Sequence, residues 1–260
     1  MNYNNLEKFL SERRLFLYKN HCKNNNNKAI LLYKANIRLS KAFYPLLSLL
    51  EISLRNSINE ELINHFSDPD WLINEKIGFM PRLNDRRFML NSVNDAEDKI
   101  RNSGKPVTND RIVAELNFGV WTSFFISRTF GILHRKPINA FTNLPAGTTR
   151  NTVSQGLDEV RKFRNKVYHN ETICFNNSIF DLTNVETIYV KIKNILGWFD
   201  PIYIKWIIDI DELPYELERI KHCANNNNAI KFYFNINRIR MNRAINKIAN
   251  SHLLFKQTTS

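Results

Sequence analysis

The sequence predicts an all-α protein built as a helical bundle, and three observations carry this prediction. Apolar residues recur at steps of three and four in several long segments, which is the spacing of a helix with one buried face. Strand and helix patterns do not alternate, and the seven glycines form no phosphate-binding loop, so a nucleotide-binding α/β fold is not expected. A hydrophobic content of 43% in 260 residues is enough for a sizeable core.

The N-terminal part is expected to contain two or three helices. Apolar positions with helical spacing cover residues 4–20, and four asparagines at 24–27 then end the pattern, because asparagine favours turns. Residues 35–66 carry an apolar stripe long enough for one or two helices. Pro45 fits the first turn of a helix, so we expect a helix to begin near residues 40–42.

The middle of the chain contains a polar helix followed by an apolar one. Residues 83–101 are charged and have helical spacing, and the Gly and Pro at 103–106 end this pattern. Thr108 or Asn109 can cap the next helix, which continues to Ile126 and is apolar nearly all round. We interpret it as buried core, and the alternative is a platform on which nucleotides stack.

Two further helices are well defined by their spacing, and the C-terminal region is ambiguous. Thr148 or Thr149 can cap a helix whose apolar residues continue to Val167. The most regular periodicity covers residues 182–199. Residues 230–255 mix the spacing of a strand with that of a helix, and the predicted fold class accordingly includes room for a short β-hairpin.

The net charge of +12 is concentrated at the two ends of the chain. Residues 1–41 carry +7 and residues 213–260 carry +6, whereas the segment between them carries −1. Basic ends around a nearly neutral middle suit a protein that binds a polyanion such as RNA, because each phosphate contact releases counterions. The alternative is that the basic composition only keeps the protein soluble. Weak RNA contacts are expected from Arg13, Arg14, Arg238, Arg240, Arg243 and Lys247.

Cysteine usage and hydropathy indicate the expected environment. Cys22, Cys174 and Cys223 form no Cys-x-x-Cys pair, so we expect reduced thiols, no zinc site and no metal or other cofactor. No uncharged apolar run reaches the roughly 18 residues of a membrane-spanning helix, and charges interrupt the N-terminus where a signal peptide needs an apolar stretch. We therefore expect a cytoplasmic protein with no membrane partner.

The candidate site lies in the segment Arg164-Asn165-Lys166-Val167-Tyr168-His169-Asn170. Among the segments that place a histidine shortly after an arginine, this one alone has a carboxamide directly after the arginine and a polar cap directly after the histidine. The spacing itself is not specific in a chain this rich in arginine. An arginine followed by four to six residues and a histidine occurs three times, at Arg14 to His21, Arg128 to His134, and Arg164 to His169.

This pattern resembles the signature of HEPN ribonucleases, and in particular of Abi-like (abortive infection) proteins of the AbiD and AbiF kind. Two further segments, in the same order, are similar to motifs of that family: Leu50-Glu51-Ile52-Ser53-Leu54-Arg55-Asn56 and Glu115-Leu116-Asn117-Phe118-Gly119-Val120-Trp121. The resemblance covers residues 43–171. The family often has a second His or Arg after the motif histidine, where this chain has Asn170 and Glu171.

The resemblance implies an HEPN-like helical core at 35–212 between basic segments at 1–34 and 213–260. It implies an RNA endonuclease that acts in phage defence (abortive infection) or as a toxin, controlled by a structured non-coding RNA. It also implies a homodimer, because HEPN sites usually form where two copies of the motif meet across a two-fold axis. The implied catalytic residues are Arg164, Asn165 and His169, and the supporting residues are Glu51, Arg55, Asn56, Lys166 and Asn170.

The residue types fit RNA cleavage without reference to any family. Attack of a 2′-OH on the adjacent phosphate needs a proton acceptor, a proton donor and positive charge near the phosphate. His169 can serve in either proton role near neutral pH, and Arg164 offers a permanently charged fork to phosphate oxygens. Asn165 can orient the phosphate or the 2′-OH, which distinguishes RNA from DNA. This scheme needs no metal and predicts a 2′,3′-cyclic phosphate product.

Helix geometry adds a constraint on the site. Residues five apart on a regular helix differ in direction by about 140°, so Arg164 and His169 do not share a face. Either the helix ends or distorts near Tyr168, or two chains form a composite site.

Structural alternatives to the site remain at this stage. Arg164 can pair with Asp158 or Glu159 while His169 ends a helix against its dipole. Glu51 and Arg55 have the spacing of an ordinary ion pair within one helix. A second functional hypothesis is a non-catalytic protein that holds a specific structured RNA.

Overall fold

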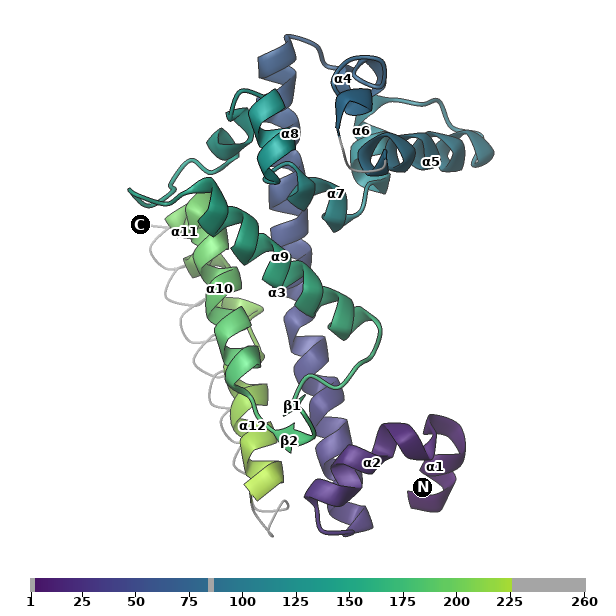
Figure 1. Cartoon of the computed structure of the whole chain (residues 1–260). Helices are drawn as coiled ribbons and strands as arrows, with labels where there is room; N and C mark the ends of the chain where they lie inside the picture. The colour runs from purple at the N-terminus through teal and green to yellow at the C-terminus, as the bar shows by residue number, and fades with distance from the viewer. Residues whose placement is uncertain (1–2, 84–86, 226–260) are drawn as a thin grey trace, which may run out of the picture. The chain divides into compact units, whose positions relative to one another are not determined.

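The computed structural model describes residues 3–83 and 87–225, and it confirms the all-α class (Figure 1). Within these residues only two short strands occur. The α-helices are α1 (Tyr3–Leu10), α2 (Glu12–His21), α3 (Asn26–Phe66), α4 (Trp71–Asn74), α5 (Phe88–Asn102), α6 (Asn109–Glu115), α7 (Phe118–Ser123), α8 (Ser127–Ile132), α9 (Arg150–Tyr168), α10 (Thr183–Phe199), α11 (Pro201–Trp206) and α12 (Leu213–Asn225). Short 3-10 helices are η1 (Met80–Arg82), η2 (Lys136–Ala140) and η3 (Ile207–Asp209).

The chain divides into two compact units, and α3 contributes residues to both. Of the described residues, one unit contains 3–42, 172–182 and 212–225, and the other contains 43–83, 87–171 and 183–211. The second unit therefore holds all three motifs that the sequence singled out.

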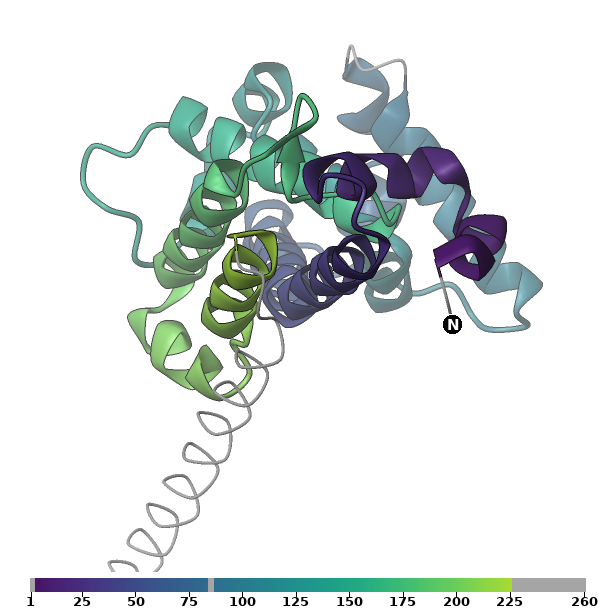
Figure 2. The ribbon, with the colours of Figure 1, turned by 90° about the horizontal axis from the view of Figure 1, so that it is seen from below.

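In the first unit, α2 and a β-hairpin lie beside the N-terminal part of α3 (Figures 1 and 2). The ring of Tyr18 on α2 meets Tyr33 of α3 and Phe175 of the hairpin edge-on, at centroid distances of 5.2 and 5.3 Å. Strand β1 (Phe175–Asn176) pairs antiparallel with β2 (Ile179–Phe180), and both residues of the turn between them have positive φ, as in a type I′ turn.

One sequence expectation in this unit needs correction. The helix expected at 4–20 is divided into α1 and α2 at Ser11, whose φ of 72° is incompatible with a continuous helix. The short β-hairpin that the predicted fold class included occurs at residues 175–180. The sequence did not give its position, because strands of two residues show no alternation of apolar and polar positions. The ambiguous segment 230–255 lies outside the described residues.

Helix α3 is longer than the sequence predicted, and Pro45 lies inside it rather than in its first turn. The helix has 41 residues and begins at Asn26, so the expected start near residues 40–42 was wrong. A proline inside a helix removes a backbone hydrogen bond and costs about 3 kcal/mol. Burial of apolar side chains at helical spacing on both sides of Pro45 offsets this cost. These side chains include Leu32, Leu39, Leu46, Leu50, Leu54 and Ile58, all 0% exposed.

The apolar segment after Asn109 forms core, as predicted, although it is two helices rather than one. Helix α6 ends at Glu115, and Asn117 caps α7 by accepting a hydrogen bond from the N–H of Val120 at 3.3 Å. Trp121 is fully buried and stacks on Phe124 with ring centroids 5.8 Å apart. These rings are therefore not available as a surface on which nucleotides stack.

Helices α9 and α10 agree closely with the sequence prediction, and they pack together in the second unit. The hydroxyl of Thr149 accepts a hydrogen bond from the N–H of Thr152 at 3.2 Å, which confirms Thr149 as the N-cap of α9. Helix α7 packs against α9 as well. Helix α9, which carries the candidate motif, is thus held by neighbours from several parts of the sequence.

Candidate active site at the end of α9

A left-handed asparagine ends α9 and fixes the position of His169. Asn170 has a φ of 55°, and its N–H bonds to the carbonyl of Val167 at 3.1 Å. The following N–H bonds to the carbonyl of Lys166 at 2.9 Å, which completes the Schellman motif that commonly ends helices. The helix thus ends at Tyr168, and the side chain of His169 is exposed at its terminus.

Arg164 contacts α3, where its Nη2 lies 3.0 Å from a carboxylate oxygen of Glu51. The two residues are 113 positions apart in the chain and belong to two of the three sequence motifs. Only 23% of the Arg164 side chain and 19% of the Glu51 side chain are exposed. Water therefore screens this ion pair less than it screens a surface pair, and Glu51 holds the guanidinium in one position.

The local ion pairs that competed with this arrangement do not form. Asp158 and Glu159 both have partners other than Arg164. Hydrogen bonds from lysine and arginine side chains hold the pKa of Asp158 below its ordinary value. The partners are Lys162 and Arg161 for Asp158, and Lys191 of α10 for Glu159.

Arg55 does not form the expected ion pair within α3, because Glu51 binds Arg164 instead. It lies one turn after Glu51 on the same face of the helix. Within the described residues, the buried Nε atoms of Arg55 and Arg164 both have no hydrogen-bond partner. Glu51 thus has Arg164 as its ionic partner and leaves Arg55 outside the pair. Asn56, the neighbouring residue, is exposed.

Asn165 and His169 lie at neighbouring positions on the surface of α9, because they are four residues apart. Asn165 is half-buried, and His169 and Lys166 are exposed. Arg164, in contrast, is directed at α3, and no hydrogen bond or ring contact joins it to His169 in the part of the chain that the structure describes. One chain thus brings Arg164 to Glu51 and Asn165 to His169, but it does not bring the arginine to the histidine.

The third motif packs against α9 one turn before Arg164. A Cβ added at Gly119 would lie 2.9 Å from the Oδ1 of Asn117 and 3.8 Å from the Cδ of Arg161. The small residue thus allows α7 to cap its own N-terminus and to approach α9. Glu115, at the start of this motif, is exposed at the end of α6.

Two tyrosines beside the Glu51–Arg164 pair were missed by sequence reasoning. The guanidinium of Arg164 lies over the ring of Tyr168, with the Cζ atom 4.4 Å from the centroid. The ring of Tyr44 on α3 lies 6.2 Å from that of Tyr168. Spacing could have found them, because Tyr44 precedes Glu51 by two helical turns and Tyr168 follows Arg164 by one.

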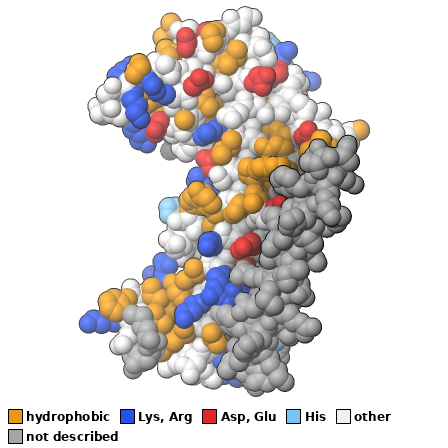
Figure 3. Space-filling model, turned by 180° about the vertical axis from the view of Figure 1, so that it is seen from behind, with side chains coloured by type: hydrophobic (Ala, Val, Ile, Leu, Met, Phe, Trp, Pro, Cys, Tyr) orange, Lys and Arg blue, Asp and Glu red, His pale blue; other side chains and the backbone are white. Residues whose placement is uncertain are grey.

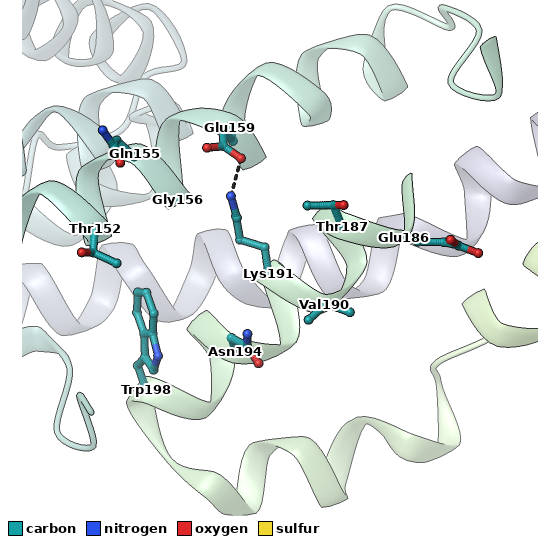
Figure 4. A pocket seen from close by; sticks show the side chains of 10 residues that line it. All are labelled: Thr152, Gln155, Gly156, Glu159, Glu186, Thr187, Val190, Lys191, Asn194 and Trp198. Atoms are coloured by element: carbon teal, nitrogen blue, oxygen red, sulfur yellow. Dashed lines mark hydrogen bonds and ion pairs between the residues drawn. The ribbon is translucent and has the colours of Figure 1, made fainter. Parts of the chain in front are cut away.

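A separate groove of about 610 Å³ lies between α9 and α10 (Figure 4). Its lining comes from the first half of α9 and includes Glu159, Lys191 and Trp198, and the Glu159–Lys191 ion pair joins the two helices there. The side chains that line it do not include Arg164, Asn165 or His169. The groove is therefore distinct from the candidate site.

The basic residues predicted to make weak RNA contacts are only partly described. Arg13 and Arg14 are exposed on α2, and basic side chains lie beside apolar ones over the N-terminal helices in Figure 3. Arg238, Arg240, Arg243 and Lys247 lie outside the described residues.

Over residues 3–83 and 87–225, no group of three or more His, Cys, Asp and Glu side chains is arranged to hold a metal ion. In the same residues, no helix combines the length and apolarity that crossing a membrane requires. Comparisons with protein-family models, curated proteins and solved structures gave no match to this chain.

Proposed function

We propose that this protein is a metal-independent RNA endonuclease of the HEPN type, with Arg164, Asn165 and His169 as its catalytic residues. The Glu51–Arg164 ion pair carries the proposal, because it joins two motifs that the sequence alone had singled out. Packing of Gly119 against Arg161, one turn before Arg164, adds the third motif to the same helix. The exposed His169 supplies a group that can exchange protons with a bound substrate.

The proposed reaction is a transphosphorylation within the RNA chain. The 2′-oxygen forms a bond to the adjacent phosphorus, and the bond from phosphorus to the 5′-oxygen breaks. One imidazole takes the 2′-OH proton and another gives a proton to the leaving 5′-oxygen. Arg164 binds the non-bridging oxygens as their negative charge increases, and Asn165 positions the 2′-OH. The products are a 2′,3′-cyclic phosphate and a 5′-hydroxyl.

The proposed scheme uses one imidazole as base and another as acid, whereas the motif of one chain contains a single histidine, His169. Arg164 faces α3 and His169 is exposed at the end of α9, so one chain does not bring this arginine and this histidine to the same phosphate. A two-fold axis near the end of α9 brings His169 of the partner subunit to the same phosphate. Sedimentation analysis of the purified chain tests this, and a stable active monomer would contradict it.

We place this activity in phage defence or toxicity, under the control of a bound structured RNA. Exposed Arg13 and Arg14 on α2 support binding of a second RNA away from the motif. Expression of the chain in bacteria challenged with phage tests the biological part of the proposal. Wild-type protein is expected to lower the phage yield, and the Arg164→Ala variant is expected to leave it unchanged.

Cleavage of total cellular RNA in the presence of EDTA tests the chemistry. The protein is first washed at high salt to remove bound RNA, and the product ends are then mapped. We expect 2′,3′-cyclic phosphate and 5′-hydroxyl ends, and we expect Arg164→Ala to lower the rate about 10²–10³-fold, as loss of a group that stabilises developing charge does. Products with 3′-hydroxyl ends, or an Arg164→Ala variant as fast as the wild type, would exclude this mechanism.

A second candidate function is RNA binding without catalysis. Exposed aromatic rings accompany the exposed arginines of α2. Phe9 on α1 is 71% exposed, and Phe16 on α2 is 55% exposed. Arginine and aromatic side chains together favour binding of RNA. If this function is the correct one, RNA co-purifies with the chain, binding weakens steeply with salt, and total cellular RNA stays intact.

A further inference from the structure

Tyr44 and Tyr168 form an exposed pair of aromatic rings, here called the tyrosine pair, on two different helices. Their centroids are 6.2 Å apart and their planes differ by 33°. Tyr44 is 57% exposed and Tyr168 is 42% exposed. Most large apolar side chains of the second unit are buried, so two adjacent exposed rings call for an explanation.

The tyrosine pair is continuous with the Glu51–Arg164 contact. Tyr44 and Glu51 lie on one face of α3, and Tyr168 and Arg164 lie on one face of α9, where Arg164 covers part of the Tyr168 ring. Two contacts thus join α3 to α9. The ring of Tyr44 contacts that of Tyr168, and the carboxylate of Glu51 contacts the guanidinium of Arg164. A group bound by Arg164 therefore has an aromatic surface directly beside it.

We propose that the tyrosine pair is a stacking platform for a nucleobase of single-stranded RNA, next to the phosphate that Arg164 binds. The inference rests on the proposed function and names its substrate class. Base stacking on aromatic side chains tolerates every base, so the platform selects for unpaired strands rather than for a particular sequence. A base inside a duplex is already stacked on its neighbours and does not reach the rings.

Charge around the rings favours nucleic acid over a protein partner. The guanidinium of Arg164 contacts the Tyr168 ring directly. Burial raises the pKa of Tyr168, so its phenol stays neutral and does not repel phosphate. A guanidinium beside two adjacent rings matches the alternation of phosphate and base along a single strand.

Equilibrium binding of an uncleavable RNA tests the platform independently of catalysis. The probe is a fluorescent single-stranded 2′-O-methyl RNA, which has no 2′-OH to attack the phosphate, and binding is followed by anisotropy. We expect Tyr168→Ala and Tyr44→Ala each to weaken binding about tenfold, the effect of losing one stacked base. Tyr168→Phe keeps the ring and is expected to bind within about twofold of the wild type. The matched control is Trp206→Ala, which removes a ring that is 63% exposed on α11 and should leave binding unchanged.

Three results would overturn the platform. They are unchanged affinity in both alanine variants, an equal loss of affinity for a fully paired duplex of the same chemistry, and dissociation of a dimer by the same substitutions at the concentration of the assay. The last result would assign the rings to a subunit contact. If the protein fails to cleave RNA but still binds the probe through the tyrosine pair, the nuclease proposal falls and the platform remains.

Discussion

Arg128 and Arg164 are each followed by a histidine within six residues, yet their guanidinium groups have different partners. The Nε and Nη2 of Arg128 donate to the backbone carbonyl of Arg82 at 3.1 and 2.8 Å. Arg164 binds a carboxylate on a different helix and keeps an exposed histidine beyond it. The first arginine therefore fastens the 3-10 helix η1, whereas the second joins α9 to α3.

The histidines of the two segments also differ in their surroundings. His134 has a φ of 49° and lies with its ring 6.0 Å from that of His65, whose pKa it helps to lower. His169 follows a helix and faces solvent. The comparison shows that the same spacing of arginine and histidine is given quite different neighbours by the fold.

Exchanging the two histidines for alanine gives the largest expected difference between the segments. His169→Ala is expected to lower the rate of RNA cleavage about 10²–10⁴-fold, the usual contribution of an acid–base group. His134→Ala is expected to cleave within about twofold of the wild type. Rates are measured on the same RNA, and circular dichroism confirms that both variants are folded. Equal losses in both variants would remove the distinction between the segments.

Removing the carboxylate that holds Arg164 is expected to have a smaller effect. Glu51→Gln removes the charge but keeps the size of the side chain, so Arg164 remains present but is less well positioned. We expect kcat to fall about tenfold with little change in KM, and stability to fall by about 1–2 kcal/mol because the pair is largely buried. The matched control is Glu159→Gln, which breaks the ion pair to Lys191 in the same unit.

The Glu51 prediction is checked by steady-state kinetics and by urea unfolding of both variants. Loss of activity in Glu159→Gln as large as that in Glu51→Gln would show that any ion pair of α9 matters equally. Full activity of Glu51→Gln would remove the positioning role of the contact.

The smallest expected effect concerns the segment of Arg128 and His134, where His65 makes the stability of the protein depend on pH. Burial, with Lys136 and His134 nearby, lowers the pKa of His65 below its ordinary value of 6.5. His65 therefore has a lower pKa in the folded chain than in the unfolded chain, and between these two values the unfolded chain binds more protons. The free energy of unfolding consequently decreases as the pH falls below about 6.5. Urea midpoints at pH 5 and 8 are expected to differ less in His65→Gln than in the wild type. An identical pH dependence in both proteins would exclude this contribution.

The sequence by itself determined the fold class, the extents of α9 and α10, the apolar core after Asn109 and the choice of the segment that contains His169. These features follow from local rules, because helical spacing, caps and apolar runs are readable one turn at a time. Asn170 belongs with them, since an asparagine that adopts positive φ ends a helix through its own backbone.

The tertiary structure decided which side chains meet. Spacing within one helix offered Arg55 to Glu51 and Asp158 or Glu159 to Arg164, and the fold instead paired Glu51 with Arg164. The same long-range packing let α3 continue through Pro45 and placed Tyr44 beside Tyr168. Such contacts depend on the crossing of two helices far apart in the chain, and that crossing is set by the summed burial of their apolar faces rather than by any local pattern.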